Sequence, residues 1–306
     1  MTFIRYFIDY KRWLIGIMIL ATGPSNIWAG QQVLIVANTN DGAYAQVIKG
    51  FKAQLSTGAK YTEVYKPTSA SIAQEINQNK PDLIFALGAD VSELVQQKST
   101  TIPIISTLVQ KEQTFKAANS TGVSLNYSFA TQIQWLKKFL PEQHKVAVLY
   151  NSAENTGAIH ALKKVAEQEG LGLMAIPVES PRQLPDALDQ LANNVDVLLA
   201  IPDEIALSSA TVKEVMLATF RNHVPLIGLS DNWVKSGALY ALSWDYDDLG
   251  RQCAAQAQKL FSGQAIKYIS PETPRKVAYS INAKIAADMN IVISDSLLQK
   301  AKTTFN

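Results

Sequence analysis

Short runs of apolar residues alternate along the chain with longer segments in which apolar residues recur every three or four positions. Several of the short runs are apolar throughout, as strands are when helices cover both faces of a parallel sheet. The longer segments predict amphipathic helices, such as the one with the stripe Val47, Ile48, Phe51 and Leu55. The pattern predicts strands at residues 33–37, 82–87, 103–105, 145–150, 195–201 and 225–229.

This alternation of strand and helix occurs twice, over residues 31–127 and again over residues 145–240. Right-handed crossovers place helices on both faces of a sheet, so each half predicts a doubly wound α/β lobe. A helical segment at 132–140, closed by Pro141, lies between the halves. We therefore predict an α/β fold of two doubly wound parallel-sheet lobes, joined by a hinge and separated by a cleft.

Polar loops follow the predicted strands, at the carboxyl ends where open α/β sheets bind small molecules. The loop 151–156 carries an acid, two amides and two hydroxyls. We expect these loops to face the cleft and to contact a ligand. The candidate ligand-binding residues are Asn38, Asn40, Tyr44, Gly88, Asn151, Ser152, Glu154, Asn155, Asp203, Asp231, Trp233 and Trp244.

Each candidate also has a structural interpretation. Glu154 can accept hydrogen bonds from a ligand ammonium, and Asn151 and Asn155 can bond a carboxylate or an amide. Alternatively, Ser152 or Asn155 caps a helix that begins near Gly157. The aspartates can equally cap helices or form turns, and the aromatic rings can either stack on a flat ligand or pack in the core. The sequence leaves these alternatives open.

The amino-terminal region has the features of a secretory signal. Arg5, Lys11 and Arg12 precede an apolar run at 13–21, and the small residue Ala29 follows. A basic start, a short apolar segment and a small residue before the cleavage point are typical of such signals. We predict a signal peptide at 1–29 and an exported protein; an uncleaved membrane anchor is the alternative.

Charge and candidate chemistry exclude several classes of function. The chain has 28 basic and 26 acidic residues, and loss of residues 1–29 removes three basic residues and one acidic residue, which leaves no net charge. A basic surface for nucleic acid is therefore not expected. Cys253 lies in an apolar stripe that predicts burial, and His144, His160 and His223 are isolated in sequence. We predict a protein that is not an enzyme, with no catalytic residues, no cofactor and no metal site.

Several ordered segments resemble one known family. Together they make the chain similar to the substrate-binding proteins of ABC transporters, in the branch related to tryptophan and other aromatic amino-acid binding proteins. The segments are Asn-x-Thr-Gly-Val at 119–123, residues 145–151 with Glu154 and Asn155, Ile201-Pro202-Asp203, Ser236-Gly237-Ala238, Asp245-Tyr246, Leu249-Gly250, Ser280-Ile281-Asn282 and the ending 291–294.

The resemblance implies a type I periplasmic-binding fold, a periplasmic location, a small-molecule ligand and an ABC permease in the inner membrane as partner. We expect a monomer that captures a small molecule, an amino acid or a heterocycle, between its lobes. Residues 30–125 with 244–272 are expected to form lobe one, and residues 126–243 with 273–306 lobe two.

Of two other functions, the pattern leaves one open and disfavours the second. The protein can instead be the ligand-sensing component of a membrane signalling or regulatory complex, without transport. An enzyme of two α/β lobes, such as a sugar-nucleotide transferase, is disfavoured by the export signal and the missing acid–base constellation. Lobe one departs from the family pattern at 38–44 and 106–111, so the sequence does not decide whether lobe one keeps the ligand contacts of the family.

Overall fold

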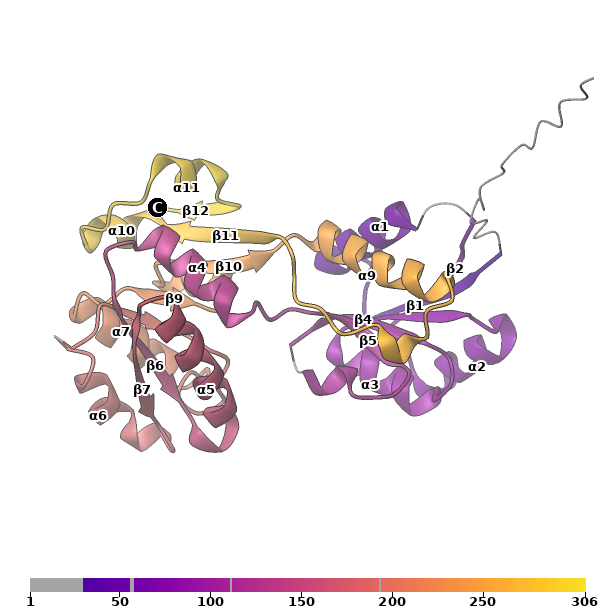
Figure 1. The fold of residues 1–306 in the computed structure, drawn as a ribbon, viewed down its shortest axis with the longest axis horizontal. Coiled ribbons are helices and arrows are strands. Elements are labelled where there is room, and N and C mark those ends of the chain that lie inside the picture. Colours follow the sequence, from indigo (N-terminus) through magenta and orange to yellow (C-terminus); the bar gives the residue numbers. More distant parts are fainter. Residues whose placement is uncertain (1–29, 56–57, 111, 193) are drawn as a thin grey trace, which may run out of the picture.

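The computed structural model describes residues 30–55, 58–110, 112–192 and 194–306, which form two lobes with a separate sheet in each (Figure 1). The predicted signal at 1–29 lies outside the described residues. None of the helices in the described part of the chain is long and apolar enough to cross a membrane. The predicted fold class of two α/β lobes is confirmed.

Lobe one is a parallel five-stranded sheet between two pairs of helices. Its elements are β1 (Gln32–Ala37), α1 (Gly42–Gln54), β2 (Lys60–Tyr65), α2 (Ser69–Asn79), β3 (Leu83–Leu87), α3 (Ala89–Lys98), β4 (Ile104–Val109), η1 (Glu112–Phe115), β5 (Ser120–Ser124), α9 (Tyr246–Phe261) and η3 (Ile266–Tyr268). The strand order is β2-β1-β3-β4-β5, and every strand pair is parallel. Helices α1 and α9 pack on one face, and α2 and α3 on the other.

Lobe two is built on a seven-stranded sheet. Its elements are α4 (Phe129–Phe139), β6 (Lys145–Tyr150), α5 (Ser152–Gln168), β7 (Gly172–Pro177), η2 (Pro181–Gln183), α6 (Leu184–Asp189), β8 (Val197–Leu199), α7 (Val212–Arg221), β9 (Leu226–Gly228), α8 (Asp231–Ser236), β10 (Tyr240–Trp244), β11 (Val277–Asn282), α10 (Ala283–Asp288), α11 (Asp295–Lys300) and β12 (Thr303–Phe305). The order is β12-β11-β10-β9-β8-β6-β7. Only the β10–β11 pair among these is antiparallel, because β11 returns from lobe one.

The apolar-run pattern misses β2, β5, β7, β10, β11 and β12, which include the strands at both edges of each sheet. Strands β2 and β7 are each outermost at one edge, and most of their residues are exposed or half-buried. A strand covered on both faces is apolar throughout, whereas an edge strand keeps polar residues toward solvent. The predicted strand at 103–105 is also too short, since β4 continues to Val109 through the polar pair Ser106 and Thr107.

Three segments cross between the lobes: from β5 to α4, from β10 to α9, and from η3 back to β11 (Figure 1). The Tyr127 hydroxyl, on the first crossing, lies 2.6 Å from the Ser243 carbonyl oxygen and 2.9 Å from that of Lys276, and can donate to either. Arg275 donates two hydrogen bonds of 2.8 Å to the buried Asp248 carboxylate. These bonds hold the pKa of Asp248 below its usual value. Side chains thus tie all three crossings together.

Two glycines set the distance between α1 and α9. A Cβ added to Gly250 would lie 2.0 Å from the Val47 carbonyl oxygen, and one added to Gly50 would lie 1.9 Å from that of Asp247. The helices can therefore touch backbone to backbone only with glycine at both positions. Since α1 follows the first loop of lobe one and α9 follows the hinge, this contact fixes that loop relative to the hinge.

Candidate functional site

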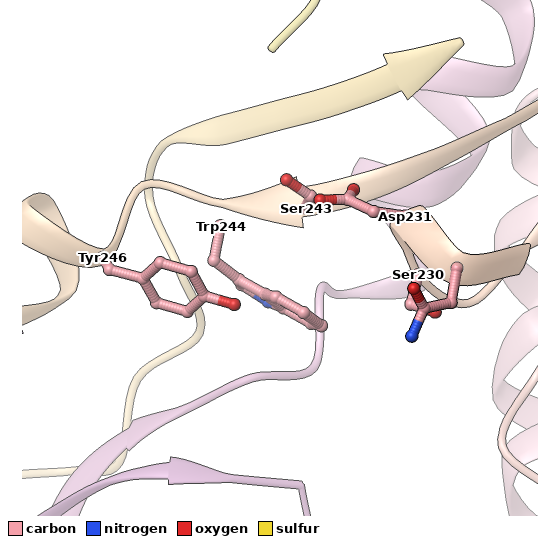
Figure 2. A pocket seen from close by; sticks show the side chains of 6 residues that line it. Ser230, Asp231, Ser243, Trp244 and Tyr246 are labelled. Carbon is pink, nitrogen blue, oxygen red and sulfur yellow. The ribbon is translucent and has the colours of Figure 1, made fainter. Parts of the chain in front are cut away.

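A pocket with a volume of about 230 Å³ opens where the second crossing leaves lobe two. Its lining residues come from the loop after β9, from the end of β10 and from the start of α9. Figure 2 shows the Trp244 and Tyr246 rings on one side and Ser230 on the other. The lining residues are Ser230, Asp231, Asn232, Ser243, Trp244 and Tyr246.

The two rings of the pocket belong to the hinge. Trp244 and Tyr246 pack against the core of lobe one, and their ring centroids are 6.3 Å apart. The Trp244 indole N–H donates a 2.7 Å hydrogen bond to the carbonyl of Leu125 on the first crossing. By contrast, Ser230 and Asp231 begin helix α8 of lobe two. The pocket therefore has walls from both sides of the hinge, so its shape depends on the hinge angle.

The carboxylate of Asp231 is the acidic group of this pocket. One oxygen accepts a 2.8 Å hydrogen bond from the Ser280 hydroxyl, and the other lies 3.2 Å from the Lys302 ammonium. The Asp231 side chain is 37% exposed, so its remaining lone pairs can reach a solute. Burial, together with the Asp231 charge, raises the pKa of Tyr246.

The loops after β6 and β8, which the sequence predicts to face a ligand, are hydrogen-bonded to each other. One oxygen of Asp203 accepts hydrogen bonds from the Asn151 backbone N–H at 2.6 Å and from the Asn155 amide at 2.8 Å. The other oxygen accepts from the backbone N–H groups of Ile205 at 2.9 Å and Ala206 at 2.7 Å. Asp203 is 6% exposed. Its carboxylate therefore fixes the two loops as one unit.

The remaining candidates on these loops are also part of this unit. Glu154 accepts a 3.0 Å hydrogen bond from the backbone N–H of Glu204. Helix α5 begins at Ser152, so the expectation of a helix starting near Gly157 is wrong, and neither Ser152 nor Asn155 is its cap. The apolar stripe begins later because the first turn of the helix is polar. Glu154 is exposed, and Ser152 and Asn155 are half-buried.

In lobe one, the structure brings two of the four candidates together. The Tyr44 hydroxyl lies 3.3 Å from the position of a Cβ on Gly88. Gly88 precedes α3 with φ +100°, a left-handed conformation that favours glycine. Asn38 and Asn40 are exposed in the connection between β1 and α1. These residues are at the carboxyl ends of β1 and β3, the edge that the topology predicts for a ligand.

The pocket contains two of the candidates, Asp231 and Trp244. Another aromatic candidate, Trp233, packs against the core of lobe two beside Gly228 and is not among the lining residues. Sequence reasoning missed the side chains of Ser243 and Tyr246, although the resemblance included Tyr246 in a matching segment. It also missed Lys302, which reaches the site from the carboxyl-terminal end of the chain.

Residues 39–305 match the family of ABC transporter substrate binding proteins. The chain belongs to this family. It is thus a substrate-binding protein that takes small ligands, in agreement with the resemblance seen in the sequence, and the family is one of solute-binding proteins rather than enzymes.

Individual relatives agree with this assignment. A tyrosine-binding protein of Clostridioides difficile (strain R20291) is 26% identical over 243 residues, which cover 76% of this chain and 70% of that protein. The ligand-free, open structure of a substrate binding protein with adhesive properties from Clostridium difficile gives a TM-score of 0.71 at 21% identity, covering 90% of this chain and 99% of that one. A domain from Streptococcus pneumonia in complex with L-Trp gives 0.54 at 18% identity, covering 89% and 100%. The structural likeness shows the shared fold.

Proposed function

We propose that this substrate-binding protein is exported to the periplasm, captures an aromatic amino acid between its lobes and delivers it to an ABC permease in the inner membrane. The observation that carries the proposal is the pocket at the hinge. It combines one accessible carboxylate, Asp231, with the rings of Trp244 and Tyr246.

These groups fit the two ends of an aromatic amino acid. A ligand ammonium can donate to the free lone pairs of Asp231, and hydrogen bonds to charged groups are the strong ones in proteins. A ligand ring can stack on Trp244 or Tyr246 in an offset or edge-to-face arrangement. The names of two relatives support the choice, since one is called a tyrosine-binding protein and another was solved with L-Trp.

The pocket is smaller than most ligand sites. Its volume of about 230 Å³ is below the ~300–1,000 Å³ that is usual for ligand sites. Closure of the hinge brings the carboxyl-end loops of lobe one, with Tyr44 and Gly88, toward the loops of lobe two. A ligand that contacts both lobes only in the closed state favours that state by the difference in its two affinities.

A thermal-shift screen of the purified protein tests this proposal. We expect L-tyrosine or L-tryptophan, at a hundred times its dissociation constant, to stabilise the protein by about 2.7 kcal/mol. This corresponds to a rise in melting temperature of roughly 5–10 °C. Sugars and nucleobases at the same concentration serve as controls. Stabilisation by a sugar, with none by any aromatic amino acid, contradicts the proposed ligand class.

A further inference from the structure

Lys302 places a cation at the edge of the hinge pocket. Its Nζ lies 3.2 Å from Oδ2 of Asp231 and 3.2 Å from the hydroxyl oxygen of Ser243, both lining residues of the pocket. It also lies 5.5 Å from the ring centroid of Tyr246. The Lys302 side chain is 39% exposed, so its ammonium is accessible from the solvent.

The backbone around Lys302 is fixed, so this position is not that of a loose chain end. The Lys302 N–H donates a 2.8 Å hydrogen bond to the Tyr279 carbonyl, and β12, which follows at once, pairs in parallel with β11. The Ser280 hydroxyl, on β11, holds the other oxygen of Asp231. Asp231 and Lys302 are thus positioned by neighbouring strands of the same sheet.

Both charged groups keep unused bonding capacity toward a ligand. The Lys302 ammonium has three N–H donors, of which Asp231 and Ser243 take two. The Asp231 carboxylate has about four acceptor sites, of which Ser280 and Lys302 occupy two. Their charges cancel, so a ligand with a single charge is attracted by one group and repelled by the other. A ligand with both charges can satisfy each group.

We propose that Lys302 sets the charge class of the ligand, and that this pocket selects a zwitterion over a simple amine or a simple acid. The inference rests on the proposed function and adds a residue and a selection rule to it. The ligand ammonium binds Asp231, and the ligand carboxylate accepts a hydrogen bond from the third donor of Lys302. Four alternating charges then lie together at the hinge, where closure of the lobes excludes water and strengthens their attraction.

The test measures the affinities of L-tyrosine, tyramine and hydroxyphenylpropionate by titration calorimetry. All three ligands contain a phenol ring. L-tyrosine carries both an ammonium and a carboxylate, tyramine carries only the ammonium, and hydroxyphenylpropionate carries only the carboxylate. We expect the unaltered protein to bind L-tyrosine at least about tenfold more tightly than either analogue, as one lost charged hydrogen bond implies. In Lys302→Met, L-tyrosine binds roughly 10- to 100-fold more weakly, whereas tyramine binds as well as before or better, because Asp231 is no longer neutralised.

Two further variants separate a charge effect from a folding effect. Lys302→Arg keeps the cation and is expected to retain the preference for L-tyrosine over tyramine. Lys300→Met removes an exposed cation two positions earlier on α11, and it should change neither affinity. The inference is overturned if the ratio of the affinities for L-tyrosine and tyramine is the same in Lys302→Met as in the unaltered protein. That result leaves the proposed function intact. If the unaltered protein binds neither L-tyrosine nor any other amino acid, both proposals fail together.

Discussion

An Asp203→Ala variant is expected to unfold with a free energy about 3–5 kcal/mol below that of the unaltered protein. The Asp203 carboxylate is buried and accepts four hydrogen bonds from the loops after β6 and β8. Its removal leaves backbone N–H groups in the interior without a partner, and each such group costs about 1–3 kcal/mol. Urea denaturation measures the change. The melting temperature should fall by roughly 6–20 °C.

The matched control is Asp189→Ala, which removes an exposed carboxylate from α6 of the same lobe. A change within about 0.5 kcal/mol is expected for it, as for most surface substitutions. The same experiment distinguishes the two interpretations of Asp203 that the sequence left open. If Asp203→Ala keeps its stability and loses its ligand, then Asp203 binds the ligand and does not support the loops.

For Asp231→Asn the large effect is on ligand affinity instead. We expect L-tyrosine to bind roughly 10- to 100-fold more weakly, because the variant keeps the shape of the side chain but loses the charge that attracts an ammonium. Stability should change by less than about 1 kcal/mol, since the Asp231–Lys302 pair is more than a third exposed and pairs of this kind contribute little. Titration calorimetry measures the affinity and thermal denaturation the stability.

Asp189→Asn is the control for this substitution, because it removes the same charge from an exposed position outside the pocket. Its affinity for L-tyrosine should equal that of the unaltered protein. An unchanged affinity in Asp231→Asn would show that the ligand ammonium binds elsewhere. In that case Glu154, which is exposed at the start of α5, becomes the next acidic candidate.

The fold could be predicted from the sequence where strands are both buried and apolar throughout. Strands β3 and β6 are covered by helices, so their apolar runs stand out against the polar loops. The edge strand β2 mixes charged, polar and aromatic residues, and the short β12 has β11 as its one strand partner in the described sheet. Their assignment depends on pairing with distant strands, and a local pattern does not carry that information.

The site could be predicted only in part, for a related reason. Asp231 was predicted because it follows a strand, and the topology turns every such loop toward one edge of the sheet. The same rule selected Asp203, but it gives no orientation, and the side chain of Asp203 turns inward to the neighbouring loops. Tyr246 reaches the pocket from the hinge and Lys302 from the position just before the last strand, 15 and 71 positions after Asp231. Only the tertiary fold brings them there.

Capture between the lobes is tested most directly by small-angle X-ray scattering of the protein with and without saturating L-tyrosine. The hinge pocket has walls from both sides of the crossings, so a bound ligand should draw the lobes together. We expect the radius of gyration to fall on addition of L-tyrosine and to stay constant with tyramine at the same concentration. A radius of gyration that does not change, although calorimetry shows the site to be filled with L-tyrosine, would contradict capture by closure.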